Sequence, residues 1–298
     1  MTACSGGGDP AAPSAQPGGE CPTDPVSVVV SVDQWGGIVS QLGGRCATVS
    51  AVVASSSVDP HDFEPAPKDA ALFEGAQLIV VNGGHYDEWA SKLAEESAPD
   101  APVIDAAEVS AEAADVGVDM HAANPHIWYS PAAVTAVADA VTAELGRLAP
   151  DAADYFTERR AEFGDALALY NQTVGSLRAI AAGKTYAATE NVFDDMAAAV
   201  GLTNRTPQGY QVAAANESDP SPADLDALLR LLSDRGVDVL IYNVQTEGSV
   251  PQQIRAAAEQ AGVPVVEVTE SVPPGAASFQ AWQVDQLSAL AEALGVGG

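Results

Sequence analysis

The chain has 298 residues, of which 47% are hydrophobic and 18% charged, a composition that supplies core material for two domains of ordinary size or one large one. Its 41 acidic and 12 basic residues give a formal net charge of −29, which argues against nucleic acid as a partner because phosphate binding needs clustered Lys and Arg. An acidic surface favours solubility and mildly enriches cations nearby, but charge alone does not identify a metal site.

The N-terminal residues 1–24 are a run of Gly, Pro, Ala and Ser, which predicts a flexible tether. This run contains no apolar signal segment, and the chain has no transmembrane stretch, so we expect it to be either cytosolic or supplied without its leader. The start "TACSGGG" resembles the end of a bacterial lipoprotein signal. That resemblance implies that Cys4 is lipidated and that residues 5–24 form the tether.

Two further cysteines, Cys21 and Cys46, remain. In an extracytoplasmic protein such a pair favours a disulfide over two free thiols. The bond would join the start of the first strand to the segment after the first helix. The sequence has no CxxC motif and no Cys/His cluster, which excludes a thiolate zinc site.

Strands alternate with helices through residues 25–150. The segment 25–44 begins with a β-branched run, changes to helical spacing and closes on two glycines, which predicts a strand followed by a helix. Further strands are expected in 47–56, 77–84 and 102–108, and further helices in 65–76 and 86–97. The segment 124–151 is expected to be a loop that leads into a helix. We interpret residues 25–150 as an N-terminal α/β lobe.

Residues 151–182 form one long helical pattern without proline, which at about 1.5 Å per residue would extend roughly 45 Å. The alternation then resumes in 183–298, with strands expected in 184–190, 237–245 and 263–270 and helices in 191–202, 220–236, 250–262 and 281–294. The predicted fold class is α/β: two lobes with parallel-rich sheets flanked by helices, joined by one long rigid linker helix. Ligands of such sheets bind beyond the carboxyl ends of the strands, which predicts a cleft between the lobes.

Four polar residues follow predicted strands and would face this cleft: His61, His126, Glu190 and Glu270. Each one alone has an ordinary explanation, because loop histidines are often solvated and a Glu after a strand often carries a helix N-terminal charge. Together, two imidazoles and two carboxylates make a mixed nitrogen and oxygen site that suits a divalent first-row metal.

Three stretches carry a resemblance to a known family: "VDPHDFEPAPKDAALFEGAQLIVVNG", "NPHIWYSP" and "PSPADLDALLRLLSDRGVDVLIYNVQ". They resemble, in order, the zinc- and manganese-binding solute-binding proteins of bacterial ABC importers, called the cluster A-I binding proteins. The resemblance implies two α/β lobes linked by one rigid helix, with a metal buried between them and no catalysis. It also implies that His61 and His126 are the first two ligands, Glu190 the third and Glu270 the fourth.

The third and fourth positions depart from the commonest pattern of that family, which has histidine at the third and aspartate at the fourth. A second carboxylate hardens the site and suits Mn²⁺ better, although intrinsic affinity still ranks Zn²⁺ above Mn²⁺. The segment that is His-rich in many zinc importers holds only His121 here. We therefore favour Mn²⁺ as the cargo, with Zn²⁺ a close second and Fe²⁺ also open.

Two other residues are candidates for an outer role. His85 follows a strand end and could donate to the site or replace the missing third histidine, although we favour a solvated loop histidine. Asn124 stands where the family often has Asp before Pro-His, so its hydrogen bond to the His126 ring would be weaker than that of a carboxylate.

The predicted function is capture of a divalent metal outside the membrane and delivery to a cognate ABC permease. We expect a monomer, attached to the membrane only through a lipid at Cys4, with no catalytic residues and no resident cofactor. The alternative is a metal-dependent, hydrolase-like enzyme that activates water at an open His₂Glu₂ site. The sequence contains no HExxH motif and no evident general base beside the ligands, which favours the binding protein. An additional adhesin role would leave the metal site in place.

Overall fold

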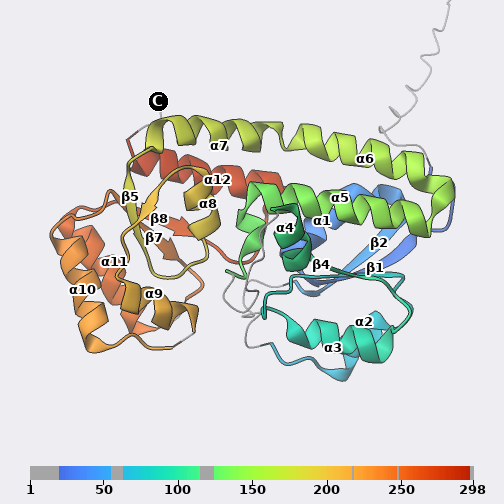
Figure 1. The fold of residues 1–298 in the computed structure, drawn as a ribbon, viewed down its shortest axis with the longest axis horizontal. Coiled ribbons are helices and arrows are strands. Elements are labelled where there is room, and N and C mark those ends of the chain that lie inside the picture. Colours follow the sequence, from blue (N-terminus) through green and yellow to red (C-terminus); the bar gives the residue numbers. More distant parts are fainter. Residues whose placement is uncertain (1–19, 55–62, 115–123, 217, 247, 296–298) are drawn as a thin grey trace, which may run out of the picture.

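The structure of the chain, a computed structural model, describes residues 20–54, 63–114, 124–216, 218–246 and 248–295. It contains two four-stranded sheets with the strand orders β2-β1-β3-β4 and β6-β5-β7-β8, in which all neighbours are parallel. The two sheets lie at opposite ends of the molecule, and helices cover their faces (Figure 1). The predicted fold class, two α/β lobes with parallel sheets, is confirmed.

The N-terminal sheet is built on β1, whose seven residues are rich in valine and buried along almost the whole strand. Such a continuous apolar run is typical of a parallel strand covered on both faces. Its strands are β1 (Val26–Val32), β2 (Ala47–Val53), β3 (Leu78–Val81) and β4 (Val103–Asp105). Its helices are α1 (Asp33–Gly43), α2 (Pro67–Phe73), α3 (Glu88–Ser97), α4 (Ala106–Ala113) and α5 (Pro131–Leu148).

The C-terminal sheet repeats this plan around β7, whose five residues are all buried. Its strands are β5 (Thr185–Ala188), β6 (Thr203–Asn204), β7 (Val239–Asn243) and β8 (Val265–Val268). Its helices are α8 (Asp194–Ala199), α9 (Gln208–Ala215), α10 (Pro222–Ser233), α11 (Ser249–Ala261) and α12 (Phe279–Ala293). Three elements were not predicted from the sequence: α4, β6 and α9. Each of them is short and either polar or rich in alanine.

The helical connection between the sheets is interrupted at one residue. We expected a single helix over 151–182, whereas the structure has α6 (Ala153–Ala166) and α7 (Ala168–Ala181), nearly in line along one side of the molecule (Figure 1). At Leu167 the backbone has φ −76° and ψ −8°, a tighter local turn than an α-helix. The backbone N–H groups of Leu167 and Asn171 still bond four residues back, so the interruption is confined to this turn.

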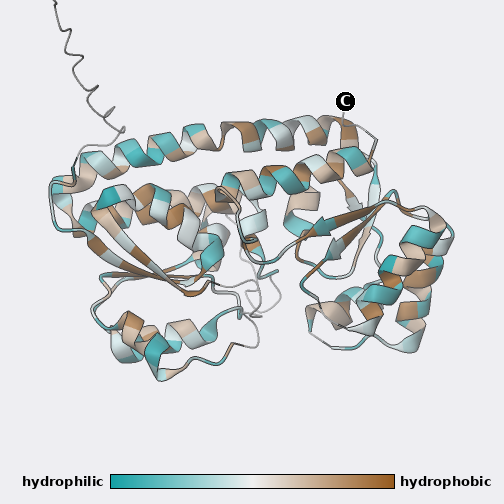
Figure 2. Ribbon diagram, turned by 180° about the vertical axis from the view of Figure 1, so that it is seen from behind, coloured by the Kyte–Doolittle hydropathy of each residue, from teal (hydrophilic) through white to brown (hydrophobic). Residues whose placement is uncertain are grey.

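A hydrophobic core runs without a break from one sheet to the other. Its buried members include Val30 and Trp35 in the N-terminal half and Phe193 and Trp282 in the C-terminal half. Tyr129, just before α5 in the N-terminal half, contacts the C-terminal half, since its ring centroid lies 5.3 Å from that of Phe193 and 5.9 Å from that of Trp282. Figure 2 shows the hydrophobic residues concentrated in the strands of both sheets. The two lobes are therefore packed against each other as well as joined through the chain.

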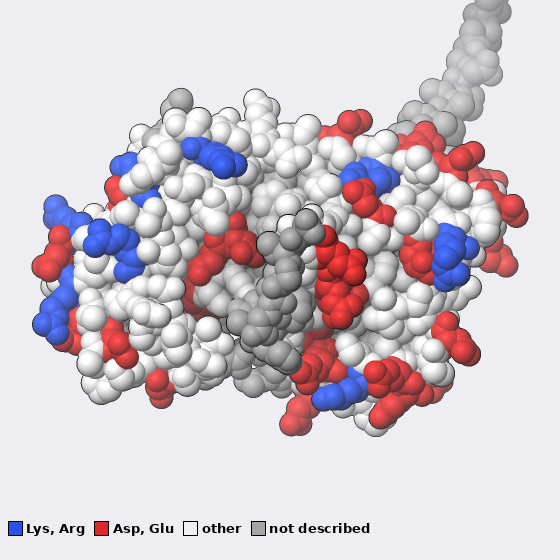
Figure 3. Space-filling view, in the orientation of Figure 1, with Lys and Arg blue, Asp and Glu red and all other residues white. Residues whose placement is uncertain are grey.

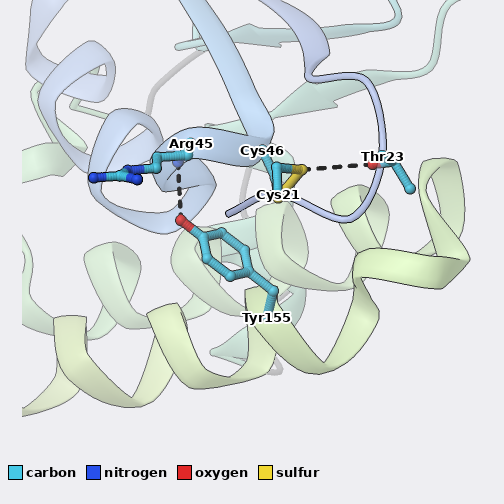
Figure 4. The surroundings of a disulfide bond; sticks show 5 residues. All are labelled: Cys21, Thr23, Arg45, Cys46 and Tyr155. Carbon is cyan, nitrogen blue, oxygen red and sulfur yellow. Dashed lines mark hydrogen bonds between the residues drawn. A yellow bond between two sulfur atoms is a disulfide. The ribbon is translucent and has the colours of Figure 1, made fainter. Parts of the chain in front are cut away.

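Cys21 and Cys46 form a disulfide near the N-terminal ends of β1 and β2, as the sequence predicted. Their Cα atoms are 5.2 Å apart, and the bond joins the segment before β1 to the 3₁₀ turn Gly44–Cys46 after α1 (Figure 4). The hydroxyl oxygen of Tyr155 on α6 accepts a hydrogen bond of 2.9 Å from the backbone N–H of Arg45. The disulfide thus fixes the beginning of the fold beside the connecting helices.

Within the described ranges, no helix is both long and apolar enough to cross a membrane. Cys4, the residue expected to carry a lipid, lies outside the described residues.

Candidate metal centre

His126 is buried at the start of a short 3₁₀ turn, with 4% of its surface exposed. Its Nδ1 lies 2.8 Å from Oδ1 of Asn124, while Nδ2 of Asn124 donates a 2.9 Å hydrogen bond to the carbonyl oxygen of Asn191. The second bond fixes the amide orientation, so Oδ1 is the atom that accepts from the imidazole. Nδ1 therefore carries the proton, and the lone pair is on Nε2, as a metal-ligating imidazole requires.

Glu270 follows β8 and faces that imidazole nitrogen. Its Oε1 lies 3.4 Å from Nε2 of His126 and accepts a 2.7 Å hydrogen bond from the Tyr86 hydroxyl. The Nε2 group of Gln34 donates to the Glu270 carbonyl oxygen at 3.1 Å. Both partners, Tyr86 and Gln34, belong to the N-terminal lobe, so the Glu270 segment is held from across the lobe boundary.

Glu190 follows β5, and the Asn243 side chain at the end of β7 holds it. Nδ2 of Asn243 donates to Oε2 of Glu190 at 2.6 Å. Burial raises the pKa of the Glu190 carboxyl and the charge of Glu270 raises it further, while the side chains of Thr246 and Asn243 and the charge of His126 lower it. The pKa of Glu190 therefore depends on the charges of both Glu270 and His126.

The described residues do not by themselves complete a metal cage. Within them, no three His, Cys, Asp or Glu side chains come close enough together to hold an ion. The structure brings His126 and Glu270 together and sets Glu190 within their electrostatic reach. His61, the fourth predicted ligand, lies outside the described residues, as does His121.

His85 lies on the surface beside α3. Its side chain is 49% exposed, and its Nδ1 is 2.5 Å from Oε1 of Glu88. The backbone of His85 has a left-handed conformation, with φ of 66°. The side chain of His85 lies on the surface next to that of Glu88.

Two acidic residues near this region were not predicted, Asp194 and Asp195 at the start of α8. Burial raises the pKa of both carboxyls, that of Asp195 to about 6, and the charge of His126 lowers both. Asp194 accepts a 2.7 Å hydrogen bond from the Tyr186 hydroxyl. In Figure 3, acidic side chains lie on both sides of the middle of this face, with Lys and Arg farther out. In the sequence, these two residues could have been noticed as a pair of acids four and five positions after Glu190.

Asn243 could have been found from the sequence by the rule that identified the ligands. It is a polar residue at the end of a buried strand, in "VLIYNVQ". Gln34 and Tyr86 gave no comparable signal, because their partner in space lies far along the chain.

Comparison with known proteins identifies the family of this fold. The sequence pattern of the family described as zinc-uptake complex component A, periplasmic (ZnuA) matches residues 28–293. The chain belongs to the ZnuA family. This confirms the resemblance read from the three motifs, and the family and its relatives are uptake and binding proteins rather than enzymes.

Two relatives of this ZnuA-family chain carry different metals in their names. The high-affinity zinc uptake system protein ZnuA of Bacillus subtilis is 26% identical over 199 residues, 63% of this chain and 61% of that protein. The manganese-binding lipoprotein MntA of Halalkalibacterium halodurans is 24% identical over 132 residues, 44% of this chain and 42% of that protein. The matched region thus spans less than two thirds of the length of either relative.

Solved structures show the same fold at lower identity. FpvC from Pseudomonas aeruginosa, determined in complex with Mn²⁺, has a TM-score of 0.73 at 22% identity, covering 92% of this chain and 100% of that chain. The shared fold agrees with the arrangement of two sheets and a long helical connection.

Proposed function

We propose that this ZnuA-family chain captures a divalent transition metal between its lobes and delivers it to an ABC importer. The observation that carries the proposal is the 3.4 Å distance between Nε2 of His126 and Oε1 of Glu270. Two ligands about 2.1 Å from one ion at a tetrahedral angle would lie about 3.4 Å apart. The Asn124 contact directs the lone pair of Nε2 toward this space, and the Tyr86 hydroxyl orients the carboxylate.

The proposed ligands are His61, His126, Glu190 and Glu270. We favour Mn²⁺ as the cargo because two carboxylates provide hard oxygen donors, and Zn²⁺ is the second candidate because it binds almost any such site more tightly. Fe²⁺ falls between them in intrinsic affinity. The relatives named for zinc and for manganese make either ion a reasonable cargo in this family.

The proposed partner is a cognate permease, with the chain acting as a monomer outside the cytoplasmic membrane. We place the chain on the membrane through a lipid at Cys4 and a tether over residues 1–24. The lipoprotein MntA, named above, supports such an anchor. In this proposal residues 25–150 and 183–298 form the lobes and residues 151–182 the rigid connection, so metal capture orders the loops of the C-terminal lobe with modest movement between lobes.

The binding protein explains the site better than the metal-dependent hydrolase does. An enzyme of that kind keeps a coordination position for water, whereas a carrier closes the shell with protein atoms. Membership of an uptake family supports the carrier. Affinity for the metal is expected to fall as pH decreases, because protons compete with the ion for the histidine ligands.

The test is calorimetric titration of metal-free protein with Zn²⁺ and Mn²⁺, comparing the wild type with His61→Ala. We expect the variant to lose affinity for both ions by about 100-fold or more, beyond the range seen when only an outer residue is removed. His85→Ala is the matched control, because that histidine is exposed beside Glu88, and it should bind both ions like the wild type. Full affinity in His61→Ala would remove the proposed site.

A further inference from the structure

The two proposed ligands of the C-terminal lobe are connected by a chain of hydrogen bonds. Nδ2 of Asn243 donates to Oε2 of Glu190 at 2.6 Å, and Oδ1 of Asn243 accepts from the backbone N–H of Gln245 at 3.1 Å. Oε1 of Gln245 accepts from the backbone N–H of Ser271 at 2.8 Å. Since Ser271 directly follows Glu270, the path runs from the Glu190 carboxylate to the backbone next to Glu270.

The Asn243 amide in this path cannot turn over without losing both of its bonds. A flipped amide would present an oxygen to the Glu190 carboxylate and an N–H₂ group to the backbone N–H of Gln245. Asn243 is also buried, with 3% exposure, and its own backbone N–H bonds to Oγ1 of Thr189 at 3.2 Å. The strands β5 and β7 thus hold a fixed hydrogen-bond donor against one particular oxygen of Glu190.

This donor affects how many oxygens Glu190 can offer to a metal. A carboxylate can bind with one oxygen or with two, and a donor seated on Oε2 favours binding through Oε1 alone. Zn²⁺ is satisfied by four ligands, whereas Mn²⁺ is typically bound by six, with oxygen donors. A one-oxygen Glu190 therefore lowers the donor count of the site and works against Mn²⁺ relative to Zn²⁺.

We infer that Asn243 is a specificity-determining positioning residue: it holds Oε2 of Glu190 so that this carboxylate binds the cargo through one oxygen, which limits the preference of the site for Mn²⁺. The inference rests on the proposed function and adds to it the residue that adjusts the choice between the two candidate ions. Gln245 has a separate role, because its side chain fixes the Ser271 backbone beside the other carboxylate.

The test uses Co²⁺ as a spectroscopic probe in the full chain, because four-coordinate Co²⁺ absorbs visible light far more strongly than six-coordinate Co²⁺. Co²⁺ spectra are recorded for the wild type, Asn243→Ala and Asn216→Ala. The ratio of Zn²⁺ to Mn²⁺ affinity is measured for the same three proteins by chelator competition. We expect Asn243→Ala to weaken the Co²⁺ bands and to lower the Zn²⁺ to Mn²⁺ affinity ratio by about 10-fold or more, within the range of outer-residue effects. Asn216→Ala is the matched control, since this exposed asparagine after α9 donates only to the Val212 carbonyl oxygen among the bonds described for its side chain, and its bands and ratio should stay close to those of the wild type.

The inference is overturned if Asn243→Ala keeps the wild-type bands and ratio, or if it folds but binds none of the three ions. It is equally overturned if Asn216→Ala changes the ratio as much as Asn243→Ala does. Should Asn243→Ala fail to fold, Asn243→Leu fills the same buried volume without a donor and is expected to give the same spectral change. Failure of the wild type itself to bind Co²⁺, Zn²⁺ and Mn²⁺ would instead contradict the proposed function.

Discussion

Glu190 and Glu270 occupy equivalent positions in the chain, each after a strand of the C-terminal sheet, yet the structure holds them in different ways. Glu190 bonds to Asn243 within its own lobe. Glu270 bonds to Tyr86 and Gln34, both from the N-terminal lobe. The lobe to which a ligand belongs by sequence is thus not always the lobe that positions it.

The segment around Glu270 is bound to the N-terminal lobe at several further points. The single proton of the Tyr129 hydroxyl faces two acceptors, the carbonyl oxygen of Thr269 at 2.6 Å and Oε1 of Gln286 at 2.8 Å. At the start of α12, the side-chain amides of Gln280 and Gln41 bond to each other between the lobes. We therefore expect Glu270 to stay with the N-terminal lobe during metal capture and Glu190 to make the larger adjustment.

The largest expected effect comes from removing the ligand held within the C-terminal lobe. Glu190→Ala should lower the affinity for Zn²⁺ and Mn²⁺ by about 100-fold or more, because it removes a ligand rather than an outer residue. Calorimetric titration measures this change. Glu267→Ala, on β8 three residues before Glu270, is the control, since its side chain is exposed and pairs with Arg255. Equal affinities for the two variants would contradict the role of Glu190.

An intermediate effect is expected from Tyr129→Phe, which removes the hydroxyl that holds Thr269. The Thr269 carbonyl oxygen would lose the hydroxyl as its donor, whereas Oε1 of Gln286 keeps the backbone N–H of Thr269. The free energy of unfolding of the metal-free protein should therefore fall by about 1–3 kcal/mol. Denaturant unfolding monitored by circular dichroism measures it. Tyr170→Phe is the matched control, because among the described residues no hydrogen-bond partner faces its buried hydroxyl. That variant should be as stable as the wild type or slightly more stable.

The smallest expected effect concerns Asp33, at the start of α1 beside the Glu270 segment. Burial raises its pKa from 3.8 to about 6, against the opposing hydrogen bonds from backbone N–H groups, including that of Val272. The folded state therefore holds this proton more tightly than the unfolded state, so between about pH 4 and 6 the contribution of Asp33 to stability falls as pH rises. Above pH 6 the buried charge remains as a destabilising contribution.

Asp33→Asn should accordingly raise the free energy of unfolding at pH 8 by roughly 1–2 kcal/mol, after allowance for solvent screening. The gain should shrink toward pH 4, where the wild-type carboxyl is itself protonated. Thermal unfolding of metal-free protein from pH 4 to 8 measures the difference. Asp100→Asn, at an exposed turn, is expected to follow the wild-type curve at every pH. A gain that stays constant with pH would exclude the ionisation of Asp33 as its cause.

Much of the architecture was predictable because it depends on local patterns. Valine-rich runs such as Val26–Val32 predict buried parallel strands, and their alternation with helices predicts two α/β lobes. The rule that ligands follow the carboxyl ends of strands selected His126 and Glu270 from the sequence. In the structure, Nε2 of His126 and Oε1 of Glu270 lie 3.4 Å apart. The interruption at Leu167 was not predictable, because no proline accompanies it and the nearby Gly164 weakens a helix without being expected to end it.

The sequence by itself thus determined the two sheets, their order in the chain and the residue types available for a metal, since these depend on neighbours within a few positions. Only the tertiary structure decided how the carboxylates are held. Gln34 and Glu270 are separated by 236 positions and Asn243 and Glu190 by 53. A hydrogen bond between such distant residues leaves no periodic trace in the sequence. The geometry of the Asn243–Glu190 bond exists only once the C-terminal sheet has formed, and that of the Gln34–Glu270 bond only once the two lobes have packed together.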